Sequence, residues 1–208
     1  MKLSKKGEYA LRSLINLGFA AEAKRELVQA SELAESEQLP VKFLEQILQV
    51  LKEAGFVRSA RGKFGGYALA KPARTIKIGQ IVRLMDGPLA PIACVSQSAY
   101  EKCTCPDEVH CGLRMLMLDV RNAIARILDR YVLGDVVDIT LRKMRRDGVS
   151  IPFMVEKLLG PTAVPEGTAS FVEHLPLSGF LAELEEAKAD RNAPPRTHRT
   201  AKGRAVKK

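Results

Sequence analysis

The hydrophobic pattern of the chain changes abruptly at Gly55. Before this glycine, apolar residues recur at the three- and four-residue spacing of amphipathic helices. After it, two short segments that read as β-strands, residues 56–59 and 67–69, flank a loop rich in glycine and basic residues, residues 60–66. Such an arrangement is typical of an antiparallel β-hairpin. The chain is therefore expected to place a two-stranded hairpin directly after a group of helices.

Three helices are expected before this hairpin. The first covers residues 4–23, with Ser4 as its N-cap, and the second covers residues 29–37. The third begins at Pro40 and ends before Gly55, because proline suits a first helical turn and glycine suits a helix end. A short helix, a third helix and a hairpin follow one another in this order in winged helix-turn-helix domains. The predicted fold class is therefore mainly α with a small β wing.

In that fold the third helix enters the major groove of DNA, and the hairpin tip contacts the backbone or the minor groove. Glutamine side chains can bind adenine, and lysine or arginine can bind guanine or phosphate. The alternative interpretation is an ordinary solvated helix face followed by a solvated hairpin turn. The candidate DNA-binding residues are Lys42, Glu45, Gln46, Gln49, Arg61 and Lys63.

All four cysteines of the 208-residue chain lie within residues 94–111. Clustered cysteines in a cytoplasmic chain indicate a metal, a cluster or a redox role before a structural disulfide. Thiolates are soft ligands that suit iron–sulfur clusters and zinc. Cys103 and Cys105 are separated by one residue, whereas zinc sites usually have two to four, and such a pair could also exchange a disulfide. An iron–sulfur centre, a thiol switch, a zinc site and incidental cysteines all stay open.

A strongly periodic segment, residues 112–131, follows the cysteines. Its apolar side chains share one face and its charged side chains the other, which predicts a long amphipathic helix. A helix of this kind outside the DNA-reading part suits homodimerisation, and packing within its own chain is the alternative. Further helices are expected over residues 76–85 and 135–146.

The predicted domain organisation has four parts. They are a winged helix-turn-helix domain over residues 1–75, a linker helix with the cysteine loop and dimerisation helix over residues 76–147, a C-terminal extension over residues 148–190, and a disordered basic tail over residues 191–208.

The net charge of +9 is a weak argument for a nucleic-acid partner. Seven of the positive charges lie in residues 191–208, which hold no acidic residue, so the rest of the chain carries 9 − 7 = +2. The tail either adds non-specific DNA affinity or is merely solvated. No apolar run approaches the length of a membrane span, and no apolar signal segment follows the N-terminus, so we expect a cytoplasmic protein with no membrane partner.

Enzymatic function is not expected from this sequence. The glycine-rich stretch, residues 62–66, joins two predicted strands and so does not match a nucleotide-binding loop, which precedes a helix. The three histidines, His110, His174 and His198, are scattered and suggest no Ser/His/Asp set. A redox enzyme or electron carrier that uses the cysteines is the alternative from a different functional class.

Four stretches resemble the IscR/NsrR/RirA family, the Rrf-two superfamily of bacterial winged-helix transcription regulators. They are MKLSKKGEYALR (1–12), FLEQIL (43–48), VRSARGKFGGYAL (57–69) and CPDEVHCG (105–112). The resemblance extends over residues 1–147. It implies a homodimer that binds palindromic double-stranded DNA as a transcriptional repressor. It also implies that an iron–sulfur cluster, 2Fe–2S or 4Fe–4S, senses iron, nitric oxide or redox state, although some members lack the cluster.

The resemblance implies that Cys94, Cys105 and Cys111 are the three cluster ligands. Cys105 and Cys111 keep the five-residue gap of the family, whereas the ten-residue gap after Cys94 is longer and Cys103 is additional. Cys103 is therefore an alternative ligand. Glu8 stands where some members supply an acidic fourth ligand from the partner subunit.

Overall fold

The structure, a computed structural model, describes residues 2–62 and 64–153. These residues belong to one compact unit of the chain, Met1–Ala169. The predicted basic tail and the C-terminal extension from residue 154 onward lie outside the described residues, as does Lys63. Within the described part, no helix is long and apolar enough to cross a membrane.

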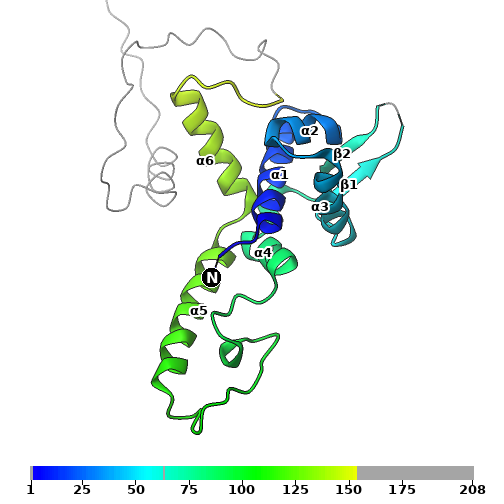
Figure 1. Ribbon diagram of the computed structural model, residues 1–208. Helices are drawn as coiled ribbons and strands as arrows, with labels where there is room; N and C mark the ends of the chain where they lie inside the picture. The colour runs from blue at the N-terminus through cyan, green and yellow to red at the C-terminus, as the bar shows by residue number, and fades with distance from the viewer. Residues whose placement is uncertain (1, 63, 154–208) are drawn as a thin grey trace, which may run out of the picture. The chain divides into compact units, whose positions relative to one another are not determined.

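The N-terminal part contains three helices, as the hydrophobic pattern predicted (Figure 1). The hydroxyl oxygen of Ser4 accepts a hydrogen bond from the N–H of Gly7 at 3.0 Å and so caps the first helix. After the third helix, Gly55 adopts a φ of +72°, which favours glycine and ends the helix. The helices are α1 (Lys5–Glu22), α2 (Ala30–Glu37) and α3 (Val41–Glu53).

The wing consists of β1 (Val57–Ala60) and β2 (Gly66–Leu69), paired antiparallel. The backbone of Val28 bonds to that of Tyr67 in both directions, at 2.9 and 2.8 Å, and fastens the α1–α2 connection to β2. A Cβ atom on Gly66 would lie 2.5 Å from the carbonyl oxygen of Val28, so this close approach requires glycine. The predicted winged helix-turn-helix fold is confirmed. The register pairs Val57 with Leu69, Arg58 with Ala68, Ser59 with Tyr67 and Ala60 with Gly66.

Three more helices follow the wing: α4 (Ile78–Asp86), α5 (Gly112–Arg130) and α6 (Leu133–Arg146). A short 3-10 turn at Ala73–Thr75 precedes α4, and another at Ala93–Val95 follows it. Buried side chains of α4 and α6 join those of α1–α3 in a single hydrophobic core. Residues on both sides of the predicted boundary at 75/76 therefore pack into the same core. The four-part organisation stays a prediction.

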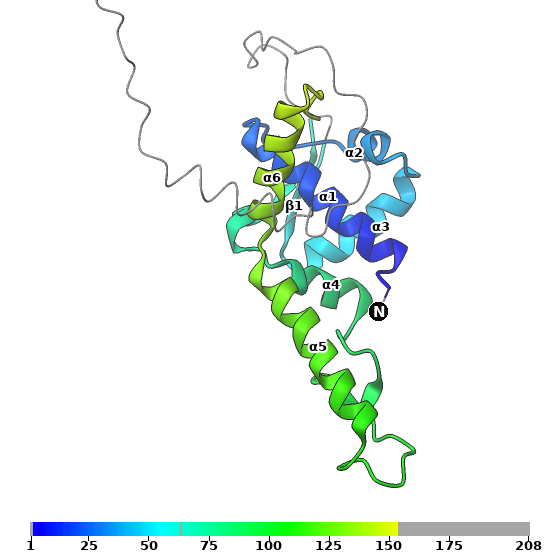
Figure 2. The same ribbon diagram turned by 90° about the vertical axis from the view of Figure 1, so that its left-hand side faces the viewer.

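Helix α4 lies between α1 and α5 (Figures 1 and 2), and polar contacts join it to both. Asp86, the last residue of α4, accepts hydrogen bonds from the backbone N–H of Ser4, at 3.0 Å, and from the Ser4 hydroxyl. Arg83 forms two parallel bonds with Asp129 of α5, at 2.6 and 2.8 Å. Helix α4 therefore connects the start of α1 with the end of α5.

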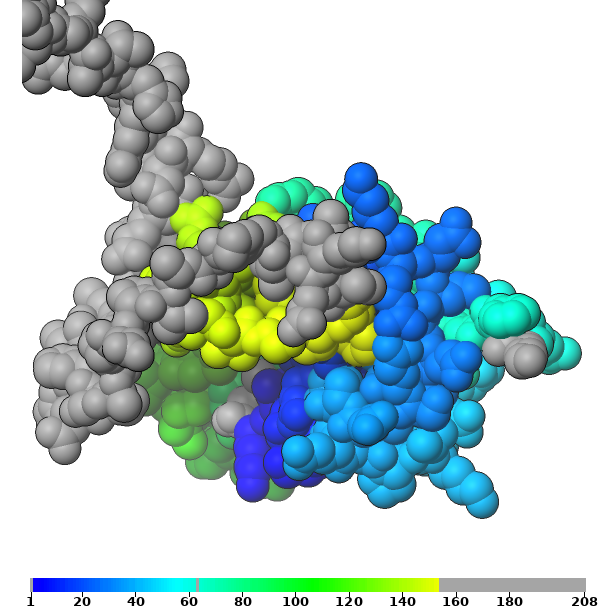
Figure 3. All heavy atoms as spheres, turned by 90° about the horizontal axis from the view of Figure 1, so that it is seen from above, coloured from blue at the N-terminus to red at the C-terminus, as the bar shows by residue number. Residues whose placement is uncertain are grey.

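The segment after α6 returns to the N-terminal helices. Figure 3 shows residues 147–153, in yellow, beside α1, in blue. Ile151 is 3% exposed and belongs to the core, and the guanidinium of Arg25 lies 5.7 Å from the ring centre of Phe153. Packing thus fixes the first residues of the predicted C-terminal extension to the winged domain.

Candidate functional site

Helix α3 presents a polar face that can enter a DNA groove. Its apolar side of Leu44, Ile47, Leu48 and Leu51 is fully buried, which fixes the orientation of the helix. The opposite side is exposed, and Gln49 donates a hydrogen bond to Glu53 at 2.7 Å. The predicted base-reading residues all lie on this exposed side: Lys42, Glu45, Gln46 and Gln49.

An open groove runs between α3 and the wing. Glu45 and Gln49 line it from α3, and the exposed Arg61 lines it from the hairpin. Tyr67 lines the same groove, and its pKa is raised first by burial and second by the Glu45 carboxylate. The structure thus brings three predicted DNA-binding residues to one surface, where they can contact the same ligand.

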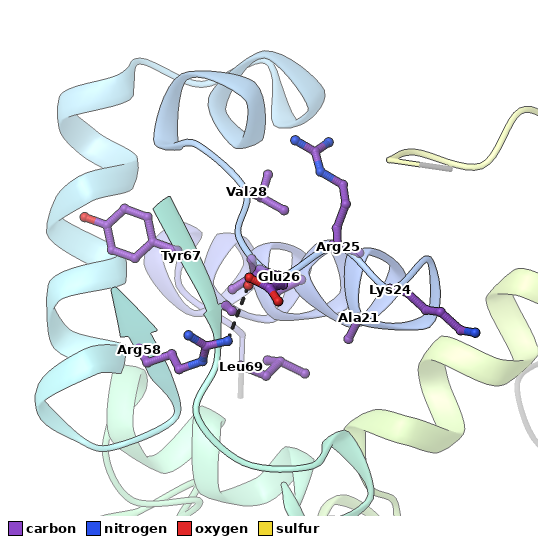
Figure 4. Close-up of a pocket in the computed structure, with 11 residues that line it drawn as sticks. Ala21, Lys24, Arg25, Glu26, Val28, Arg58, Tyr67 and Leu69 are labelled. Carbon is purple, nitrogen blue, oxygen red and sulfur yellow. Dashed lines mark hydrogen bonds between the residues drawn. The ribbon is translucent and has the colours of Figure 1, made fainter. Parts of the chain in front are cut away.

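A second hollow lies behind the wing, between the end of α1 and β2 (Figure 4). Arg58 donates a hydrogen bond to the carbonyl oxygen of Glu26 at 3.4 Å, and Arg25 forms a bidentate ion pair with Glu32. These bonds connect β1 to the α1–α2 loop and that loop to α2. Arg58 and Arg25 therefore help to fix the wing to the helices.

The cysteines lie in an irregular segment between α4 and α5. Cys94, in the turn packed against α5, is 6% exposed, whereas Cys103 and Cys111 are half-buried and Cys105 is exposed. All four are free thiols. Across residues 2–62 and 64–153, no group of three or more Cys, His, Asp or Glu side chains is arranged to hold a metal ion.

The thiols nevertheless interact with one another. Cys105 donates its backbone N–H to the sulfur of Cys103 at 3.4 Å. The hydrogen bond that the Cys105 thiol donates to Cys103, with smaller contributions that include Cys111, raises the pKa of Cys105 to about 11. Burial, followed by Cys103 and Glu108, raises the pKa of the Cys94 thiol. Cys103, for which the sequence predicted only an alternative role, therefore interacts with both Cys94 and Cys105.

Arg114, in the first turn of α5, holds the two ends of the cysteine segment together. Its backbone N–H donates to the sulfur of Cys111, the N-cap of α5, at 3.5 Å. Its side-chain Nε donates to the carbonyl oxygen of Cys94 at 3.3 Å and pairs with Glu108 at 3.2 Å. The hydroxyl of Tyr100 also donates to the Glu108 carboxylate at 2.9 Å. This role of Arg114 was not predicted from the sequence, although a cation at a helix N-terminus is unfavourable and so signals a specific partner.

Within one protomer, Glu8 interacts with two cations of its own helix. Its carboxylate lies 2.9 Å from the ammonium group of Lys5 and 3.7 Å from the guanidinium of Arg12. The hydrogen bond from Lys5 is the main cause that lowers the pKa of Glu8. The carboxylate is ionised at neutral pH, as a metal ligand must be. Its assignment to the partner subunit's cluster stays a prediction.

The donor set of the cysteine segment fits the chemistry of an iron–sulfur cluster. Four sulfur atoms lie in one irregular segment, and thiolate sulfur is the ligand that such clusters prefer. The raised pKa values of Cys94 and Cys105 favour the protonated thiols in the absence of a cation. A bound metal reverses that preference, because a coordinating thiol is deprotonated.

Helix α5 carries an exposed apolar stripe. Leu113, Leu116, Val120 and Ile127 are between 37% and 58% exposed, and Ala123 continues the line. Their spacing of three, four, three and four residues is the spacing of a coiled-coil seam. The predicted long helix therefore has a face suited to pairing with a second helix.

Comparison with known proteins gives the family. The Rrf2 family model, described as "Iron-dependent Transcriptional regulator", matches residues 3–139. An rrf2-like HTH-type transcriptional regulator of Rhodobacter capsulatus is 40% identical over 139 residues, which cover 65% of this chain and 91% of the relative. The regulator CymR of Bacillus subtilis is 31% identical over 144 residues, with coverages of 67% and 92%. IscR of Vibrio vulnificus is 29% identical over 137 residues, with coverages of 66% and 77%.

Solved structures agree with this result. The structure of CymR of B. subtilis, titled a global cysteine regulator, aligns with a TM-score of 0.54 at 29% identity and covers 66% of this chain and 97% of CymR. T. potens IscR aligns with a TM-score of 0.51 at 28% identity, with coverages of 67% and 88%. The chain belongs to the Rrf2 family of transcriptional regulators.

Proposed function

We propose that this Rrf2-family regulator is a homodimeric repressor that binds a palindromic operator, and that an iron–sulfur cluster on residues 94–111 sets its affinity for DNA. The observation that carries the proposal is the interaction of all four thiols next to the N-terminus of α5. The signal would be iron supply, nitric oxide or redox state, each of which changes a cluster of this kind.

DNA recognition would rest on α3 and the wing. Gln46 and Gln49 can each form two hydrogen bonds with adenine, and Lys42 can bind guanine or a phosphate. Arg61 at the hairpin provides a phosphate or minor-groove contact, and Lys63 has the same proposed role. The apolar stripe of α5 would pair the two protomers, so that two α3 helices read half-sites about 34–36 Å apart.

Cys94, Cys105 and Cys111 would hold the cluster, with Cys103 as the alternative ligand and Glu8 of the partner subunit as a fourth. When bound, the cluster supplies a redox-active iron centre that iron limitation or nitric oxide can remove or modify. The chain's own contribution is the orientation of the thiols. Arg114 fixes the backbone of Cys94 and the sulfur of Cys111, so a change at either cysteine acts directly on the start of α5.

Contacts through α4 would carry this change to the DNA-binding helices. Arg83 and Asp129 join α5 to α4, and Asp86 and Ser4 join α4 to the N-terminus of α1. Helix α1 packs against both α2 and α3. A coupling of about 1–3 kcal/mol is typical between two such sites and changes DNA affinity by roughly 5- to 150-fold.

A thiol switch without a cluster is the second candidate. The contact between Cys103 and Cys105 and the similarity to CymR favour it. The raised pKa of Cys105 counts against that thiol as the attacking group, because the thiolate is the reactive form. Cys103 would then have to attack. A zinc-containing regulator of the same fold is a further alternative on the same residues.

The test begins with protein purified without oxygen. A visible absorption spectrum with iron and sulfide assays decides whether a cluster is present, and a colourless, iron-free protein favours the thiol switch. Fluorescence anisotropy with DNA selected from a random pool then compares the loaded and cluster-free dimers at several salt concentrations. If neither form prefers any palindromic sequence, the proposed operator-binding function is wrong.

A further inference from the structure

A small, partly enclosed hollow lies between the end of α4, the loop that follows it and α5. Its volume is about 120 Å³. Leu89 and Ala125 provide part of an apolar wall, Ser96 and Arg121 provide polar groups, and no acidic residue lines it. The hollow contains none of the predicted cluster ligands, so its chemistry can be considered separately from theirs.

Arg121 lines this hollow with an uncompensated charge. The residue is only 9% exposed, and within the described ranges its Nε has no hydrogen-bond partner and its guanidinium forms no ion pair. Arg83 lines the same hollow, but Asp129 neutralises it through two bonds at 2.6 and 2.8 Å. A largely buried arginine without an anion is unfavourable, because its charge has lost much of its hydration and gained no partner. A bound anion would therefore neutralise the charge of Arg121 and accept hydrogen bonds from its guanidinium.

Ser96 adds a second polar group to the hollow. It is 8% exposed, and its hydroxyl oxygen accepts the N–H of Ala99 at 3.0 Å. A hydroxyl that accepts one hydrogen bond still has its own proton to donate. Partial enclosure of the hollow limits screening by water, which strengthens the attraction between an arginine and an anion.

We propose that this hollow binds one small oxyanion, with Arg121 as its charge partner and Ser96 as a hydrogen-bond donor. A cavity of about 150 Å³ can hold a molecule of the size of benzene, so 120 Å³ suffices for a five-atom tetrahedral anion or a small carboxylate. The anion would join α4, the cysteine segment and α5 at one point. None of the four cysteines lines the hollow, so the inference does not rest on the proposed cluster.

Isothermal titration of the full-length dimer tests this site. Sodium sulfate, phosphate and acetate are titrated separately against a background of sodium chloride at constant ionic strength. We expect saturable binding of at least one oxyanion to the wild-type protein, and binding at least tenfold weaker in Arg121→Met. Arg121→Lys, which keeps the charge, should retain part of the affinity. Preference for sulfate and phosphate would identify a tetrahedral ligand, and preference for acetate a carboxylate.

Arg126→Met is the matched control, because Arg126 is an exposed arginine on the same helix. It should bind the anion as the wild-type protein does. Arg121→Met removes an unpaired buried charge, so in chloride alone its melting temperature should be at least that of the wild type. Equal oxyanion binding by wild-type and Arg121→Met protein, or no saturable binding by the wild type, would overturn the proposal. A change in dimer dissociation without any change in anion binding would also overturn it, and would assign Arg121 to the subunit contact.

Discussion

The ion pair of Arg83 and Asp129 offers a direct test of how α5 is joined to α4. Asp129→Asn keeps the size of the side chain but removes its charge and one of its two acceptor oxygens. The side chains are 38% and 37% exposed, so solvent screening limits the pair, and its bidentate geometry places it near the upper end of surface pairs, at about 1 kcal/mol. We expect a loss of about 1 kcal/mol in the free energy of unfolding, or about 2–4 °C in melting temperature.

The pH dependence of this effect has a defined sign. The hydrogen bonds from Arg83 lower the pKa of Asp129 below its ordinary value. A carboxyl group whose pKa is lower in the folded state stabilises the fold above its unfolded pKa and loses that contribution as the pH falls through its folded value. The difference between wild-type and Asp129→Asn protein should therefore be complete at pH 7 and shrink below about pH 4.

Urea unfolding followed by circular dichroism, at pH 7 and at pH 3.5, measures the loss in the free energy of unfolding and its dependence on pH. Asp119→Asn is the control, since Asp119 is an exposed carboxylate on the same helix. If Asp129→Asn costs no more than the roughly 0.5 kcal/mol of ordinary surface substitutions, or if its effect is the same at both pH values, the assigned role of the pair is refuted. Asp129→Asn, unlike the control, should also reduce the difference in DNA affinity between loaded and cluster-free dimers.

Four further substitutions test other parts of the molecule. Gly66→Ala should destabilise the fold by about 1–3 kcal/mol in urea unfolding, because its Cβ would lie 2.5 Å from the Val28 carbonyl oxygen. Arg61→Ala should weaken DNA binding similarly for all sequences and reduce the slope of log affinity against log salt by about one, and an unchanged slope would exclude a phosphate contact. Leu116→Glu, on the α5 stripe, should convert the dimer to monomers in analytical ultracentrifugation, whereas Arg126→Glu should not. Cys103→Ser should keep the iron content if Cys94, Cys105 and Cys111 are the ligands, and loss of iron would make Cys103 a ligand.

Local sequence signals predicted the regular elements well, because their causes are local. Ser4 caps α1 through a residue three positions away, and Gly55 ends α3 through its own backbone conformation. The apolar periodicity of residues 112–131 predicted α5 to within one residue of its end. The short turn Ala73–Thr75 was missed, since a 3-10 turn of three residues has no hydrophobic period.

The contacts that connect the elements could not be predicted in this way. Asp86 and Ser4 are 82 positions apart, and nothing in either local sequence indicates that they meet. The position of Cys103 among the other thiols depends on an irregular loop, where spacing does not determine proximity. The importance of Arg121 rests on its burial, which is a property of the packed structure.

If the cysteine segment controls DNA binding as proposed, these connecting contacts are the path by which it reaches α1. The cysteine segment lacks regular structure between the 3-10 turn at Ala93–Val95 and α5. Arg114 of α5 bonds to both ends of this segment, at Cys94 and at Cys111. Helices α1 and α4, in contrast, share the hydrophobic core, so a movement of one against the other disrupts contacts between buried side chains. A change at the cysteines is therefore expected to reorient the segment and the start of α5 first, and to reach α1 through Asp129, Arg83 and Asp86. Weakening that path should leave DNA binding intact while uncoupling it from the state of the cysteines.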